Sequence, residues 1–111
     1  MSTASFTDGD TWGGRPVARR LADAAPRHRV VVTGTVCGTG TARSGALGPR
    51  GSFWCELDDG TGRIGLLFLG RSDVPGLTHG VRCTVEGTAR PERGGLVLWN
   101  PLYRLEPPGE R

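Results

Sequence analysis

Glycine occupies 19 of the 111 positions and proline another 8, and this density constrains the fold more than any other feature. Glycine and proline are the two poorest residues in a helix interior, and glycine usually makes up only about 7% of a chain. A chain that can turn so often favours short strands joined by tight turns. Its length suits one domain, and its apolar runs are too short for a membrane-spanning segment.

Side chains alternate between apolar and polar in five segments, which is the period of a β-strand. The alternation is clearest where Val81, Cys83 and Val85 share one face and polar residues occupy the other. An Asp-Gly turn at 58–62 and a loop at 90–95 would join neighbouring strands as hairpins. A loop at 37–51 and a connector at 70–79 separate the others. The predicted strands span residues 29–36, 52–57, 63–69, 81–90 and 96–105.

The N-terminal region differs from the rest of the chain. Residues 1–14 are polar, contain glycines and lack the apolar stretch of a signal peptide, so we expect a flexible tail and a cytoplasmic protein. In the segment 15–28, Pro16 suits a first helical position and Pro26 suits a helix end, which predicts a short basic helix. The expected organisation is therefore this tail and helix, a barrel over 29–106, and a C-terminal tail over 107–111.

Five short strands close most naturally into a barrel, because closure removes exposed strand edges. Their order resembles the OB-fold, a five-stranded Greek-key barrel. The resemblance lies in VVTGTV at 31–36, FWCELDDGTGRIGLLFLG at 53–70, GVRCTVEGTA at 80–89 and GLVLWNP at 95–101. These stretches are similar to OB domains of the tRNA-anticodon type, such as the wedge domain of the RecG helicase and small stand-alone OB proteins of actinobacteria. One departure is the connector at 70–79, which is too short and broken for the helix found there in many OB-folds.

The resemblance implies nucleic-acid binding across the second and third strands, between the first loop and the last hairpin loop. Binding to a single strand requires cations for phosphates and flat side chains for bases. Trp54 faces outward if its neighbours fill the barrel, and Leu67 is then its apolar neighbour. The indole either stacks on a base or packs beneath the predicted N-terminal helix. The candidate binding residues are Trp54, Arg43, Arg50, Arg63, Leu67, Arg90 and Arg93.

Two alternatives concern these candidates. The arginines flank the expected groove, and the alternative to phosphate binding is that they only keep the loops soluble. Trp99 and Tyr103 on the last strand are further stacking candidates, each with a structural role as its alternative.

Charge and reactive residues narrow the function classes. The net charge is +3, and all 14 basic residues are arginine, so no lysine is present for a phosphate loop or a Schiff base. Three separated cysteines and two histidines lack the spacing of a zinc site and predict small buried residues in strands. Asp58 and Asp59 are expected to fix their turn. We therefore expect no enzyme, no metal and no cofactor.

The predicted function is binding of nucleic acid, in the first place single-stranded DNA, with little sequence preference. An RNA or tRNA binder and a protein–protein interaction module on the same barrel are the alternatives. A membrane partner is not expected.

Overall fold

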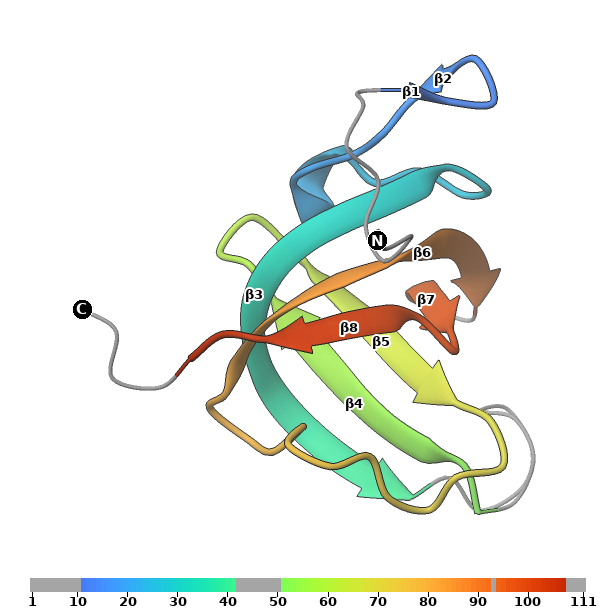
Figure 1. Ribbon diagram of the computed structural model, residues 1–111. Helices are drawn as coiled ribbons and strands as arrows, with labels where there is room; N and C mark the ends of the chain where they lie inside the picture. Colours follow the sequence, from blue (N-terminus) through green and yellow to red (C-terminus); the bar gives the residue numbers. More distant parts are fainter. Residues whose placement is uncertain (1–10, 42–50, 93, 108–111) are drawn as a thin grey trace, which may run out of the picture.

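The computed structural model describes residues 11–41, 51–92 and 94–107, which form an all-β structure (Figure 1). No helix in these ranges is long and apolar enough to cross a membrane. The elements are β1 (Thr11–Trp12), β2 (Arg15–Pro16), the one-turn 3-10 helix η1 (Leu21–Asp23), β3 (Arg29–Thr41), β4 (Phe53–Asp58), β5 (Arg63–Phe68), β6 (Arg82–Glu92), β7 (Gly95–Trp99) and β8 (Leu102–Leu105).

Five of the strands close into a barrel. Hydrogen bonding follows the order β3-β4-β5-β7-β6, and β6 pairs again with β3. The β5–β7 pair is parallel, and the other neighbours are antiparallel. β8 is an additional strand on β6. This closed all-β barrel is consistent with the OB-like architecture expected from the sequence.

β3 is long and bent because it pairs with β6 along its first half and with β4 along its second half. Residues 29–35 pair with β6, and 35–41 pair with β4, with a register shift between Val36 and Gly38. At Gly34 a Cβ atom would lie 2.7 Å from the carbonyl oxygen of Asp58, so only glycine allows this close passage. The predicted end of this strand at residue 36 was wrong, because the following residues hydrogen-bond to β4.

The barrel interior follows the predicted alternation. Phe53, Cys55 and Leu57 of β4 point inward and are buried. Leu21, beside the β4–β5 turn, fills one end of the barrel, and the connector after β5 supplies buried residues to the other end. The connector forms no helix, as its sequence indicated.

The predicted basic helix over 15–28 does not form. A small β1–β2 hairpin occupies residues 11–16, and Ala18 then pairs in parallel with Val30 of β3. The N–H of Ala18 donates to the carbonyl of Arg29 (3.0 Å), and the N–H of Val31 donates to the carbonyl of Ala18 (2.9 Å). This pairing at the edge of β3 satisfies both backbone groups of Ala18, which a helix would have paired internally.

The following residues dock on the β4–β5 turn. The N–H of Leu21 donates to Asp59 Oδ2 at 2.8 Å, and the N–H of Ala22 donates to Thr61 Oγ1 at 2.9 Å. Burial of the Leu21 side chain contributes about 2 kcal/mol. These distant partners replace the predicted helix with extended chain and a single 3-10 turn.

The predicted fifth strand over 96–105 is divided into β7 and β8. Asn100 has a φ of +49°, its N–H donates to the carbonyl of Leu67 (2.6 Å), and its Oδ1 accepts the N–H of Leu69 (2.9 Å). Pro101 has no N–H and cannot continue the ladder. The chain therefore leaves β5 here, and β8 pairs with residues 83–86 of β6, an earlier stretch than the one that pairs with β7. The preceding loop is also shorter than predicted, because β6 runs to Glu92.

Candidate functional site

The outer face of the barrel carries a row of large apolar side chains across three strands. Trp54 of β4 is opposite Leu67 of β5, and Leu67 is beside Trp99 of β7. Neighbouring strands are about 4.8 Å apart, which separates the two tryptophan backbones by roughly 10 Å. Leu67 is only 2% exposed, whereas Trp54 is partly exposed and Trp99 is 36% exposed. The row therefore presents two indoles on either side of a buried leucine.

The Trp54 indole rests on glycines. Cβ atoms at Gly38 and Gly40 of β3 would lie 4.0 and 3.9 Å from its six-membered ring, and one at Gly65 of β5 would lie 3.6 Å from its Nε1. No side chain at these three positions covers the ring. The predicted packing of Trp54 beneath an N-terminal helix was wrong, because residues 15–28 form no helix.

A groove of about 270 Å³ lies beside Trp54. Gly65 and Val97 line it between Trp54 and the β6–β7 turn, and a Cβ on Gly65 would approach Val97 to 3.3 Å. The narrow floor on β5 therefore depends on the missing side chain of this glycine. The indole of Trp54 thus forms part of the wall of this groove.

Charge in the described part of the groove is mostly negative. Arg63 Nε lies 3.0 Å from Asp58 Oδ2, and its NH1 lies 3.6 Å from Glu56 Oε1. The hydrogen bond with Asp58, and then nearby negative charge, raise the pKa of Arg63. Glu92 lines the opposite side of the groove. Arg63 is thus held by carboxylates rather than presented alone to a ligand.

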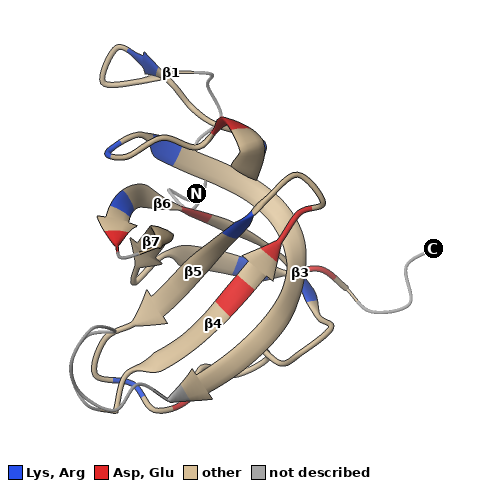
Figure 2. Ribbon diagram, turned by 180° about the vertical axis from the view of Figure 1, so that it is seen from behind, with Lys and Arg blue, Asp and Glu red and all other residues tan. Residues whose placement is uncertain are grey.

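Arg90 belongs to a different part of the surface. Its guanidinium carbon lies 3.8 Å from the centroid of a Trp99 ring, in a cation–π stack. The two residues line a second hollow, of about 250 Å³, together with Arg29 and Glu86. Figure 2 shows the contrast: acidic positions lie along β4, while arginines lie at the start of β3 and towards the end of β6.

The predicted site residues therefore divide into three groups. Trp54, Leu67 and Arg63 share the β4–β5 face, as expected. Arg90 is opposite Val97 of β7, which lines the groove, and its guanidinium stacks on Trp99, the residue for which the sequence left both a stacking and a structural role open. The remaining candidates, Arg43, Arg50 and Arg93, lie outside the described residues.

Tyr103 is accounted for by packing. Its ring meets Phe68 edge-on at 5.7 Å, and its hydroxyl donates to the carbonyl of Pro75 at 3.4 Å. Tyr103 therefore has a structural role, because its ring packs against Phe68. Trp99 differs from it, because its ring is exposed on the outer face.

The acidic turn is structural, as predicted. Asp58 Oδ1 accepts the N–H of Gly60 at 2.7 Å, and Asp59 accepts hydrogen bonds from Leu21, Thr61 and Gly62. Burial opposes ionisation of Asp59, but these hydrogen bonds outweigh it and lower the pKa of this carboxyl. Asp59 therefore joins the N-terminal segment to the barrel.

Two of the three cysteines expected to be buried, Cys55 and Cys83, occupy the core, whereas Cys37 is only half-buried. Burial raises the pKa of Cys55 to about 12 and that of Cys83 to about 11, so both thiols remain protonated near neutral pH. Across residues 11–41, 51–92 and 94–107, no group of three or more His, Cys, Asp or Glu side chains is placed to hold a metal ion.

No protein-family model matches the sequence, and no curated protein is similar to it. Any functional assignment therefore rests on the geometry and charge of this surface.

Proposed function

We propose that this protein is an OB-fold module that binds single-stranded nucleic acid, in the first place DNA, with little sequence preference. Bases would stack on the outer face of β4, β5 and β7, and arginines would neutralise the phosphates. This combination supplies both interactions that sequence-tolerant binding to a single strand needs.

The observation that carries the proposal is the setting of Trp54. The indole lies on the barrel surface over Gly38, Gly40 and Gly65, and no side chain at these positions covers it. It stands in one row with Leu67 and Trp99. A row that crosses the strands suits an extended polymer with a flat group on every unit.

The electrostatic contribution comes from arginine alone. Arginine offers a planar fork that pairs with phosphate and stacks on bases. The net charge of +3 is modest, and Arg63 already pairs with two carboxylates. We therefore expect binding that is moderate in strength and sensitive to salt.

The test is fluorescence anisotropy with labelled single-stranded DNA, single-stranded RNA and duplex DNA. Trp54→Ala is expected to weaken single-strand binding by about 1–3 kcal/mol, because one stacking platform is lost. Trp54→Phe keeps a flat ring and is expected to retain most of the affinity. Leu105→Ala is the control, since it removes an exposed apolar side chain from β8, away from the row.

Thermal melting of each variant establishes that it is folded. Unchanged affinity of a folded Trp54→Ala protein for every single strand would remove Trp54 from the site. Equal binding of duplex and single strands would contradict stacking as the source of preference.

A second candidate function is docking of another protein. The carboxylates around Arg63 favour it, as do the exposed Leu102 and Leu105 on β8, which pairs only with β6 among the described strands. It predicts no nucleic-acid binding at low salt.

A further inference from the structure

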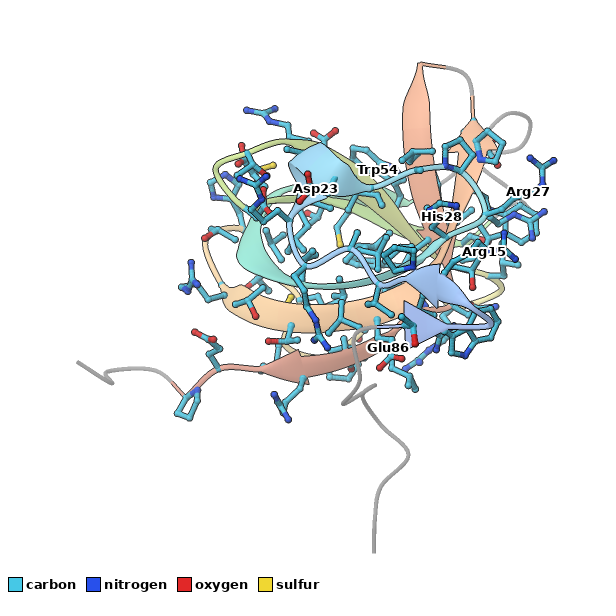
Figure 3. The ribbon with its side chains drawn as sticks, turned by 90° about the horizontal axis from the view of Figure 1, so that it is seen from above. Arg15, Asp23, Arg27, His28, Trp54 and Glu86 are labelled. Carbon is cyan, nitrogen blue, oxygen red and sulfur yellow. The ribbon has the colours of Figure 1, made fainter. Side chains whose placement is uncertain are left out.

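A second surface carries arginines and indoles from segments far apart in the sequence. The N–H of Arg27 donates to the carbonyl of Ala89 (2.7 Å), and the N–H of Ala89 donates to the carbonyl of His28 (3.0 Å). Arg27 is therefore anchored next to the residue that precedes Arg90. Figure 3 shows Arg15, Arg27 and His28 gathered on one side of the molecule. We call this the arginine surface; it comprises Arg15, Arg27, Arg29, Arg90, Trp12 and Trp99.

The β1–β2 hairpin adds the first indole. Trp12 pairs with Arg15 across the hairpin, and the Arg29 guanidinium carbon lies 5.4 Å from the centroid of a Trp12 ring. Trp12 is 46% exposed. At the other end of the surface, Arg90 lies over Trp99. Indoles and guanidinium groups thus occur together at both ends.

Positive charge on this surface is largely uncompensated. Among the described residues, the carboxylate that lines the hollow of this surface is Glu86, which is 3% exposed and pairs with Arg29 Nε at 3.0 Å. Within the described ranges, Arg15, Arg27 and Arg90 form no ion pair with a carboxylate. The β4–β5 groove shows the opposite balance, with Arg63 among three carboxylates.

Trp99 connects the two surfaces. It stands beside Leu67 in the row that begins at Trp54, and it also carries Arg90. The hollow lined by Arg29, Arg90 and Trp99 continues from this point. A ligand that follows the row past Trp99 therefore reaches the arginine surface.

From this arrangement we propose that a bound single strand runs beyond the β4–β5–β7 face, crosses Trp99 and continues over the arginine surface. This inference rests on the proposed function and extends it. The first face supplies the stacking platform at Trp54, and the arginine surface supplies phosphate contacts. The occupant is a polynucleotide because exposed indoles accompany the arginines. Bases stack on indoles, whereas an anionic chain without flat groups would contact only the arginines.

The test compares oligonucleotides of about 6 and about 16 nucleotides, within the range of site sizes known for OB-folds. Full-length protein is titrated with oligo(dT) and oligo(U) of both lengths at several salt concentrations. The double variant Arg15→Gln/Arg27→Asn removes two charges, and asparagine suits the φ of +70° at position 27. Arg82→Gln is the charge control, because Arg82 lies eight residues before Arg90 on β6, roughly 25 Å of extended strand.

The expected result is specific to the longer oligonucleotide. The double variant should weaken binding of the 16-mer several-fold and reduce the magnitude of its log–log salt slope by about 1.4, from about 0.7 per lost phosphate contact. Binding of the 6-mer should match that of the Arg82→Gln protein. Oligo(dT) and oligo(U) report whether the extended path is shared by DNA and RNA.

Two outcomes would overturn the inference while leaving the proposed function intact. One is a 16-mer that the double variant binds as tightly as the Arg82→Gln protein does. Another is an equal loss for both lengths, which indicates a general charge effect rather than a path. Poly-glutamate that competes as well as the 16-mer would overturn both the inference and the proposed function, because it removes any role for the indoles. Absence of single-strand binding by the wild type would instead overturn the proposed function itself.

Discussion

The two faces of this barrel use the same residue types in opposite ways. On the β4–β5 face, Trp54 is open over glycines, while Arg63 is held by Asp58 and Glu56. On the arginine surface, Arg15 and Arg27 have no carboxylate partner in the described structure, and the indole of Trp99 lies under Arg90. One face thus offers a partly exposed ring, and the other offers arginines without a carboxylate partner among the described residues.

This difference shows that counting arginines near a groove is a poor guide to its charge. Arg63 and Arg90 both met the sequence criterion for a groove cation. The charge of Arg63 is neutralised by Asp58, which belongs to the turn before its own strand. Arg90 instead stacks on the indole of Trp99, which lies two strands away from Trp54. We therefore propose that stacking and phosphate neutralisation occur on different parts of the surface.

The largest expected effect is a loss of stability when the arginine of an arginine–carboxylate ion pair is removed, and each face has one such arginine. Arg29 pairs with the buried Glu86, so Arg29→Ala should lower the free energy of unfolding by about 3 kcal/mol. Arg63 is exposed, and Arg63→Ala should cost less than about 1 kcal/mol. Urea unfolding of the two variants measures both values. Equal losses would mean that the two ion pairs are not energetically distinct.

A smaller effect concerns the anchor of the N-terminal segment. Asp59→Asn weakens the hydrogen bonds from Leu21, Thr61 and Gly62, and should cost about 1–2 kcal/mol. The pKa of Asp59 is lowered on folding, so its contribution is present above the unfolded pKa and is lost as pH falls through the folded one. Wild type and variant should therefore converge in stability under acid conditions.

The Asp59→Asn variant also tests whether the arginine surface contributes to binding of a long single strand. A loosened N-terminal segment should weaken binding of a 16-mer more than that of a 6-mer, because β1 and β2 belong to the arginine surface. A stability difference that persists unchanged at low pH would contradict the role given to the Asp59 carboxylate.

The smallest effect is a gain in affinity. Glu56→Gln removes one of the carboxylates that offset Arg63, and should strengthen single-strand binding roughly two- to fivefold at low salt. Anisotropy at two salt concentrations measures this gain, which should shrink as salt screens the charge. Weaker binding by this variant would show that Glu56 contacts the ligand directly.

Local patterns predicted much of the barrel. Alternation of side chains located the strands, and the Asp-Gly turn was correct because its hydrogen bonds lie within residues 58–62. The N-terminal segment could not be predicted in the same way. Its partners are the edge of β3 and the side chain of Asp59, which lies 38 residues away from Leu21.

The candidate site was also predictable only where it depends on local patterns. The period of two placed Trp54 and Leu67 on one face, since they are opposite each other in an antiparallel hairpin. The place of Trp99 depends on the parallel β5–β7 register, which closure of the barrel determines. No local pattern around Trp99 carries that information, and the same holds for the approach of Arg27 to β6.

The most direct test of the central claim is a salt titration of the wild-type protein with a labelled single strand. Neutralisation of about four phosphates predicts that log affinity falls against log salt with a slope of roughly −3, with weaker binding of duplex DNA. Absence of binding to any single strand at low salt, or an affinity independent of salt, would contradict the account and favour docking of a protein on this face.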